Sequence, residues 1–479
     1  MEEVIATVSP RVTEEMNEVL LQPFSLEEVK CALDQMYPYK SPGPDGMSPV
    51  FYQKFWHIIG LDVSGCVLAF LNHDTYTHFN STHIVLIPKC ENPVLVTDFR
   101  PISLCNVIYK LASKTIANRI KPLLNDIISE SQSAFVPGHH ITDNVLVAFE
   151  LNHFLAHKRW GSVGHIALKL DIIMLEGEPF GFIRPERGLR QGDPLSPYLF
   201  IFCAEAFSCM VQQEEREGGI QGVAVCRRAP RVSHLLFADD TLLFCQATGE
   251  AMERIKLILE KYEQASGLKI NLQKSAVAFS KNTNQNLKES LARQFGVELV
   301  DKHEKYLGLP TMCCQSKREL FSNLKCRVWS KMQNWEAKRL SQTGRMVLIK
   351  AVAQVIPTYA MGCFLLPDGL LHELESMSAN FFWQHDDRQH IHWLSWKKLC
   401  KNKDEGGVGF RNLKAFNMAM LAKQAWRLVT VPDSLLSRVM KTKYYPDSDF
   451  LAARCGGQPS YAWRSIAASR ELIRKGIRW

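Results

Sequence analysis

Residues 233–244 read Ser-His-Leu-Leu-Phe-Ala-Asp-Asp-Thr-Leu-Leu-Phe, and the rest of the chain is organised around this stretch. Two apolar runs of strand-forming type flank Ala238, Asp239 and Asp240, which predicts a β-hairpin with both carboxylates at its tip. The apolar flanks predict burial, and a buried carboxylate is costly unless a partner neutralises it. Oxygen ligands of this kind suit Mg²⁺. The alternative is an exposed Asp-Asp turn, since Asp is common in turns.

A third carboxylate, Asp171, lies inside the apolar run 166–173, which predicts a strand. Taken alone, Asp171 fits an edge-strand position. A site for two metal ions about 4 Å apart needs several carboxylates, and a strand end beside a hairpin tip would supply the missing ligand. We therefore predict that Asp171, Asp239 and Asp240 meet and hold two Mg²⁺ ions.

A loop and a helix connect this strand to the hairpin. Residues 188–197 read Gly-Leu-Arg-Gln-Gly-Asp-Pro-Leu-Ser-Pro, with Asp193 as a predicted N-cap and Pro194 in the first turn. The following helix, 195–213, is apolar almost all round and is predicted to lie in the core. Strand, helix and hairpin form a β-α-β-β unit of the ferredoxin-like kind, in an α/β (α+β) fold.

The N-terminal part combines helices with one short strand. Ser25 and Glu28 form a predicted capping box, and residues 40–46 form a rigid Pro-Gly loop. Residues 83–89 are predicted to be a buried strand ended by proline. The basic helix predicted at 109–124 presents its cations either to phosphates or to solvent.

The C-terminal part is mostly helical and basic. Gly267 is a predicted helix C′ residue, followed by one strand, 268–279, that carries Lys274. From residue 316 onward tryptophans alternate with basic residues; they either stack on bases or, for most of them, fill helix cores.

The positive charge is concentrated after residue 300. Residues 1–300 carry 28 Lys and Arg against 34 Asp and Glu, whereas residues 301–479 carry 29 against 15. This basic region fits a partner with a phosphate backbone, or else represents solvated helix faces.

The composition also bears on location. The 14 cysteines are scattered without a C-x-x-C pair, which indicates a reducing intracellular compartment. The N-terminal Met-Glu-Glu-Val has no signal-peptide pattern, and the longest uncharged run, 351–367, is short for a bilayer span. We expect no membrane partner, and the sequence indicates no oligomeric state.

Several motifs in the same order resemble the reverse transcriptase of non-LTR (LINE-type) retrotransposons, most closely the plant type. They include the Pro-Gly loop, the Asp171 strand, the 188–197 loop, the Asp-Asp hairpin and Lys305–Pro310. The resemblance covers nearly the whole chain. It implies a right-hand polymerase with fingers, a ferredoxin-like palm and a helical thumb, followed by a mostly helical region.

The resemblance also implies four parts. They are a helical N-terminal region with the Pro-Gly loop (1–80), fingers and palm (81–312), a helical thumb and connection (313–430), and a C-terminal helical segment (431–479).

The implied reaction is addition of deoxynucleoside triphosphates to a DNA primer on an RNA template. Asp171, Asp239 and Asp240 would be the catalytic metal ligands. The resemblance places template or nucleotide contacts at four further residues: Arg100, Gln191, Gly192 and Lys274. It also implies residence in the nucleus.

The chain departs from the family pattern after Ile173. There it runs directly into Met174-Leu175-Glu176-Gly177, which resembles sequence a few tens of residues further on in the family. The missing piece would hold the aromatic gate against ribonucleotides. Two hypotheses follow: an RNA-directed DNA polymerase, or an inactive retrotransposon remnant that only binds nucleic acid. A group II intron maturase is a more remote third, against which the Pro-Gly loop argues.

Overall fold

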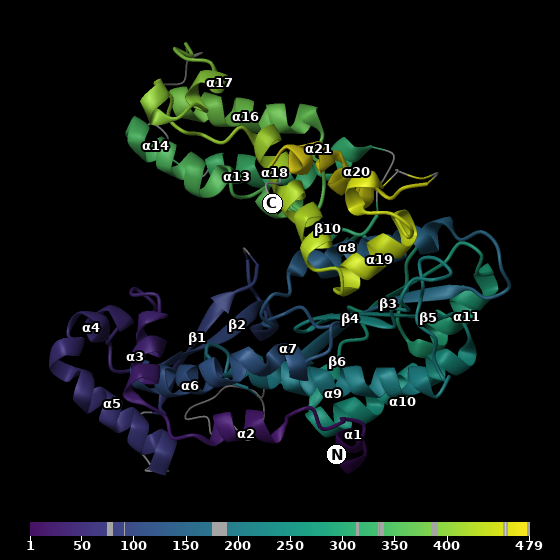
Figure 1. Ribbon diagram of the computed structural model, residues 1–479, viewed down its shortest axis with the longest axis horizontal. Coiled ribbons are helices and arrows are strands. Elements are labelled where there is room, and N and C mark those ends of the chain that lie inside the picture. Colours follow the sequence, from purple (N-terminus) through teal and green to yellow (C-terminus); the bar gives the residue numbers. More distant parts are fainter. Residues whose placement is uncertain are drawn as a thin grey trace.

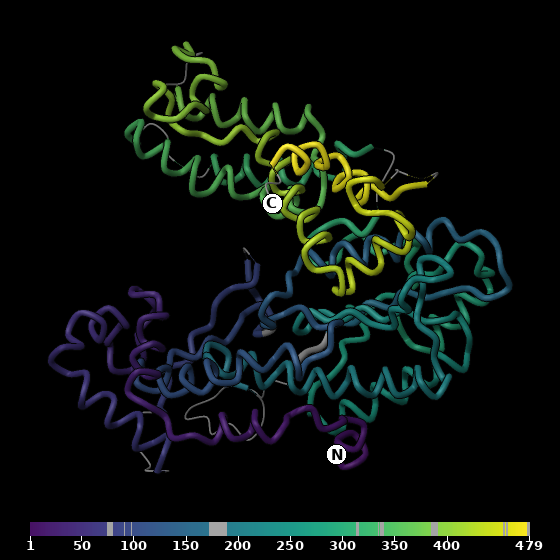
Figure 2. Tube along the Cα trace, viewed as in Figure 1, coloured from purple at the N-terminus to yellow at the C-terminus, as the bar shows by residue number. Residues whose placement is uncertain are grey.

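The computed structural model describes residues 1–73, 80–90, 92–174, 189–312, 316–333, 335, 340–384, 391–453, 456 and 458–476. It is a mixed helix and strand structure with a central sheet (Figure 1). An N-terminal helical part and a small two-stranded sheet extend from one end of this centre. Helices of the C-terminal part lie above the central sheet. The tube in Figure 2 follows the chain from the N-terminal part through the central sheet to these helices. The predicted junction after Ile173 runs into residues 175–188, which lie outside the described residues.

The central sheet has six strands: β3 (His165–Met174), β4 (His234–Phe237), β5 (Asp240–Gln246), β6 (Leu268–Ile270), β7 (Ala276–Phe279) and β8 (Glu298–Leu299). Their order is β4-β5-β3-β7-β8, with β6 also paired to β3. With α9 (Ser196–Arg216) and α10 (Gly249–Ser266), the connectivity β3-α9-β4-β5-α10-β7 is ferredoxin-like. This confirms the β-α-β-β order predicted from the sequence.

The single strand predicted at 268–279 is wrong, because the structure has two short strands with a turn between them. In that turn the backbone carbonyl of Asn271 accepts hydrogen bonds from the N–H groups of Lys274 and Ser275. Asparagine favours turns because its side chain also bonds nearby backbone, and the side-chain oxygen of Asn271 accepts from the same Lys274 N–H.

The two faces of the sheet are buried against different parts of the chain. Side chains alternate along β3, so Ile166, Leu168 and Leu170 pack on the α9 and α10 side, while Ala167 points to the opposite core. That opposite core contains Leu242 of β5 and residues of α8 (Ile141–His157). The sheet is therefore a buried layer between two hydrophobic cores.

The N-terminal part has its own core, formed by α3 (Leu26–Asp34), α4 (Pro49–Lys54), α5 (Trp56–His73) and α6 (Val107–Ile120). The other helices of this part are α1 (Glu2–Ala6), which packs in the core of α9 and α10, α2 (Glu14–Leu21) and α7 (Leu124–Ile127). Val29, Leu33 and Leu111 are fully buried between α3, α5 and α6. The predicted capping box of Ser25 and Glu28 is present at the start of α3.

Two cations of α6 are engaged within the protein, contrary to both orientations considered for this helix. Lys110 is buried and donates to the carbonyl of Ser41 at 2.9 Å, which holds the Pro-Gly loop. Arg119 forms an ion pair with Glu28 at 2.8 Å. Local sequence could not reveal these partners, since both come from more than 60 residues away.

The strand predicted to be buried at 83–89 is exposed instead. It forms β1 (Thr82–Pro88), paired antiparallel with β2 (Phe99–Cys105) in a separate two-stranded sheet. Its apolar residues Ile84 to Ile87 are each between 42% and 48% exposed. A run of apolar residues indicates a strand, but the neighbouring elements decide whether it is covered.

After the central sheet, the chain is mostly helical. Its elements are α11 (Gln285–Phe295), β9 (Lys305–Tyr306), β10 (Leu309–Pro310), α12 (Lys317–Leu320), α13 (Ser322–Gln333), α14 (Gln342–Leu348), a π-helical turn (Ile349–Ala353), α15 (Thr358–Met361), α16 (Asp368–Trp383), α17 (Trp396–Leu399), α18 (Leu413–Thr430), α19 (Leu435–Tyr444), α20 (Tyr461–Ala468) and α21 (Arg470–Gly476). In the part that the structure describes, no helix is both long and apolar enough to cross a membrane.

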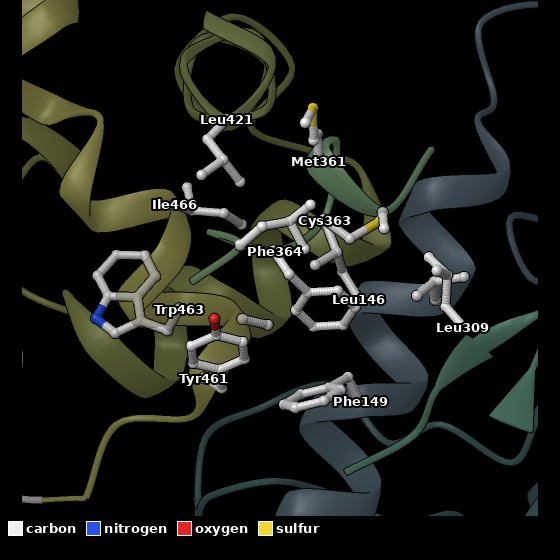
Figure 3. Packing of buried hydrophobic residues seen from close by; sticks show 14 of the residues in the cluster. Leu146, Phe149, Leu309, Met361, Cys363, Phe364, Leu421, Tyr461, Trp463 and Ile466 are labelled. Atoms are coloured by element: carbon white, nitrogen blue, oxygen red, sulfur yellow. The ribbon is translucent and has the colours of Figure 1, made fainter. Parts of the chain in front are cut away.

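The C-terminal helices share one hydrophobic core with α8 (Figure 3). Phe149 of α8 contacts Phe364 at 5.1 Å between ring centroids, and Phe364 stacks on Tyr461 at 5.8 Å. Trp463 is fully buried, whereas Trp329 and Trp393 are exposed. Core packing is thus the role of Trp463, as predicted for most of the tryptophans.

A buried charge reinforces the same interface. Glu150 of α8 is 0% exposed, and it accepts hydrogen bonds from the Lys443 ammonium and the Tyr444 hydroxyl, both at 2.7 Å. The Ser460 hydroxyl donates to its other oxygen. Because a buried carboxylate is stable only when such partners satisfy it, the C-terminal helices are fixed on α8 at a defined position.

Candidate active site

The strand register brings two of the predicted aspartates together. Asp171 near the end of β3 is the cross-strand partner of Asp240 at the start of β5. Residues directly opposite in an antiparallel pair have Cβ atoms about 4.5–5.5 Å apart on the same face. Asp239 immediately precedes Asp240, at the turn between β4 and β5. All three predicted carboxylates therefore lie at one end of the sheet.

The three carboxylates interact electrostatically. Burial raises the pKa of Asp240, and the charges of Asp239 and Asp171 raise it further. The ammonium of Lys169, two residues before Asp171 on β3, acts in the opposite direction. Like charges held together in a half-buried place create a site that favours a cation.

The donor set fits a hard divalent cation, because carboxylate oxygens are the ligands that Mg²⁺ prefers. In the residues that the structure describes, no three His, Cys, Asp or Glu side chains converge as a preformed metal-binding group. The backbone register thus brings the aspartates to a common end of the sheet without closing their side chains around one point.

Lys274 belongs to the same end of the sheet. Its turn is attached to the strand of the first aspartate, because the Asn271 N–H donates to the carbonyl of Asp171 at 2.8 Å. The Asp171 N–H in turn donates to the Ser275 hydroxyl oxygen at 3.4 Å. Lys274 itself is exposed. A mobile ammonium on a fixed turn beside carboxylates is suited to contact a phosphate that approaches them.

Arg100 lies on β2, whereas Gln191 and Gly192 lie in a loop beside that strand. The Ser103 N–H donates to the carbonyl of Gln191 at 2.8 Å, and Arg100 is an exposed residue of the same strand. Gly192 has φ +110°, and a Cβ there would come within 2.7 Å of the Ser103 carbonyl oxygen. Among the described residues no hydrogen bond or ion pair joins these three residues to the aspartates.

The loop that opens α9 is held by Asp193. The helix begins at Ser196 rather than Leu195, and one carboxylate oxygen of Asp193 accepts the Leu195 N–H at 3.0 Å. The other accepts the Tyr109 hydroxyl of α6 at 2.9 Å. The predicted N-cap is therefore wrong, because the N-cap of α9 is Leu195, which forms no side-chain cap hydrogen bond; Asp193 instead holds the preceding loop and ties it to α6.

The sequence did not single out two tyrosines near the aspartates. Burial raises the pKa of both Tyr306 and Tyr359, and the charge of Asp240 raises each further. The Tyr359 hydroxyl donates to the carbonyl of Leu307 at 3.0 Å. Tyr306 lies in a motif that the resemblance included, but no local pattern pointed to Tyr359, which lies about 120 residues beyond Asp240 in the chain.

The comparisons with known proteins agree with this arrangement. Residues 87–311 match the family described as "Reverse transcriptase (RNA-dependent DNA polymerase)", and this match includes all three aspartates. A transposon protein, the TX1 uncharacterized 149 kDa protein of Xenopus laevis, is 27% identical over 84% of this chain. Residues 87–311 therefore form a reverse transcriptase domain. The relatives of the chain include proteins of a transposon and of a retrotransposable element.

Two further relatives define the extent of this similarity. The polyprotein of the retrotransposable element R2DM of Drosophila melanogaster is 27% identical over 54% of the chain. An uncharacterized mitochondrial protein of Arabidopsis thaliana is 45% identical over 124 residues, which are 26% of this chain and 80% of that protein. The chain spans 33% of the Xenopus protein and 27% of the Drosophila protein.

Proposed function

We propose that this reverse transcriptase extends a DNA primer on an RNA template with deoxynucleoside triphosphates. The observation that carries the proposal is the cross-strand pairing of Asp171 with Asp240 beside Asp239. The central sheet with α9 and α10 would be the palm, the region of β1 and β2 the fingers, and the helices after residue 313 the thumb and its C-terminal extension.

The reaction needs the negative charge of the triphosphate to be neutralised. Reverse transcriptases as a family use divalent metal ions, and Asp171, Asp239 and Asp240 would hold two Mg²⁺ here. When bound, the ions supply activation of the primer 3′ hydroxyl and stabilisation of the leaving pyrophosphate.

The remaining residues would position the substrates. Lys274 is near enough to Asp171 to contact the triphosphate, and its positive charge stabilises negative charge that develops on the leaving group. Arg100, on exposed β2, would contact the template or the incoming nucleotide. Gln191 and Gly192, held against Ser103, would lie along the nascent base pair.

A second candidate function is nucleic-acid binding without polymerisation. The feature that favours it is the charge of residues 301–479, with 29 basic against 15 acidic residues, because this excess does not depend on the aspartates. Such binding would weaken steeply as salt is raised, since each phosphate contact releases counterions.

Primer extension by the purified chain tests the proposal, with an RNA template, a DNA primer and Mg²⁺. We expect Asp240→Asn and Asp171→Asn to lower the extension rate roughly a thousand-fold or more, because several kcal/mol of charge stabilisation would be lost. The control is Asp433→Asn, which changes an exposed aspartate outside this site and should leave the rate unchanged. A wild-type chain that binds RNA in a salt-dependent way but never extends the primer would support the second candidate.

A further inference from the structure

We propose that Gln132 is a positioning residue for the catalytic turn, and that its side-chain carbonyl fixes the backbone of Ala238, on which the placement of Asp239 and Asp240 depends. The effect on polymerisation rests on the proposed function, but the contact itself does not.

The turn between β4 and β5 has an unfavourable backbone conformation. Ala238 has φ +52°, one of three positive values at residues other than glycine in the described part of the chain. The Cβ of an L-residue crowds the following carbonyl in this left-handed region, so an alanine stays there only when its surroundings hold it. Ala238 directly precedes the two aspartates, and any relaxation of its φ would change their direction relative to Asp171.

Gln132 supplies a contact that holds Ala238. Its side-chain oxygen accepts the Ala238 N–H at 3.2 Å and the Ala134 N–H at 2.9 Å. The residue is 1% exposed, so water does not compete for these bonds. One oxygen thus joins the hairpin turn to a segment more than 100 residues earlier in the chain.

The segment around Gln132 is itself firmly placed on the hairpin. It runs parallel to β4 as an added pairing, in which the Leu236 N–H donates to the Ser131 carbonyl at 2.8 Å. The Ser133 N–H donates back to the Leu236 carbonyl at 3.1 Å. The Asn144 side chain of α8 donates to the same carbonyl at 2.7 Å. The amide of Gln132 therefore approaches the turn from a fixed direction.

The nitrogen of the Gln132 side-chain amide indicates that overall stability alone does not explain why a glutamine stands at this position. Its Nε2 is buried and has no hydrogen-bond partner. A buried unpaired donor destabilises a fold, and such groups in native proteins call for an explanation. Fixing the turn that carries the aspartates provides one.

The test replaces the acceptor while keeping the volume, with Gln132→Met. We expect faster amide hydrogen exchange in the peptide covering residues 237–241, at least ten-fold slower primer extension, and a higher Mg²⁺ concentration at half-maximal rate. Adding Ala238→Gly should recover most of the extension, because glycine adopts positive φ without a Cβ penalty, while the N–H of residue 238 stays without its acceptor and still exchanges fast. A role in overall stability would not be repaired by that second change.

The matched control is Gln424→Met. Gln424 is also a buried glutamine with an unpaired amide atom, but it contacts Thr142 of α8 rather than the turn. It should leave exchange at 237–241 and the Mg²⁺ dependence unchanged.

The outcomes separate the two proposals. Unchanged exchange at 237–241 in Gln132→Met overturns the positioning contact. Faster exchange with unchanged extension overturns its role in catalysis. Faster exchange in Gln132→Met, together with a wild-type chain that does not extend primers, supports the contact and overturns the proposed function.

Discussion

The hairpins β1–β2 and β4–β5 begin with similar sequences and end in opposite environments. Residues 83–87 of β1 read His-Ile-Val-Leu-Ile, and β4 begins at residue 234 with His-Leu-Leu-Phe. Leu86 of β1 is 44% exposed, whereas Leu235 of β4 is 0% exposed. Their histidines differ in the same way, since His83 is exposed and His234 is buried. Similar local sequences therefore do not determine burial.

What surrounds each hairpin explains the difference. The β4–β5 hairpin lies between the core of α9 and α10 on one face and the core of α8 on the other. The β1 strand pairs only with β2 among the described strands, and its apolar residues belong to none of the hydrophobic clusters in the described residues. Burial supplies the rigidity that a site for chemistry needs, so the aspartates lie on the covered hairpin.

The largest difference between the hairpins should appear on removing a buried side chain. We expect Leu242→Ala in β5 to lower the free energy of unfolding by about 2–5 kcal/mol, because Leu242 is 0% exposed and its loss leaves a cavity. Urea titration followed by circular dichroism measures this. A loss below about 1 kcal/mol would mean that β5 is not packed between two cores.

Titration of the histidines in the two hairpins should give a change in stability of intermediate size. Burial lowers the pKa of His234 to about 4, from an ordinary value near 6.5. The unfolded chain therefore binds a proton more readily, so this histidine lowers stability as pH falls from about 6.5 toward 4. Between pH 7 and pH 5 the loss should be about 2 kcal/mol.

Two matched variants isolate this contribution. His234→Gln removes the titrating ring and can still bond Ser131 and Ser208, whose hydroxyls contact the His234 Nε2 at 2.8 and 2.6 Å. We expect it to reduce the stability difference between pH 7 and pH 5 by about 2 kcal/mol. His83→Gln, at the exposed equivalent position, should not change the difference. Equal effects of both variants would contradict the contrast between the hairpins.

The smallest effect is expected on the exposed hairpin. Leu86→Ala should lower the free energy of unfolding by less than about 1 kcal/mol, because nearly half of this side chain is in water before the change. The same urea titration measures it beside Leu242→Ala. A cost as large as that of Leu242→Ala would show that β1 is covered in solution.

Local patterns predicted the elements that depend on local rules. Apolar runs with turn residues between them predicted β3 and the β4–β5 hairpin, and Gly267 ends α10 in the left-handed conformation as expected. The N-cap predicted at Asp193 is two residues early, because the helix is capped at Leu195. The candidate site could be predicted because its three aspartates lie within strong strand patterns in the order that a ferredoxin-like sheet requires.

Other features depend on contacts between distant residues and could not be predicted. The exposure of β1, the partners of Lys110 and Arg119, and the approach of Tyr359 to Asp240 all involve segments far apart in the chain. The bond from Gln132 to Ala238 is of the same kind.

The sequence by itself determined the strand that carries Asp171, the two strands that flank Ala238, Asp239 and Asp240, and the negative charge at that hairpin tip. These features depend on the spacing of apolar side chains along the sequence and on the conformational preferences of turn residues. Both act over a few residues. Only the tertiary structure decided which of two similar hairpins is covered, and which distant amide contacts the turn before Asp239 and Asp240. Burial and hydrogen bonding at those places depend on neighbours that are brought together only when the chain folds.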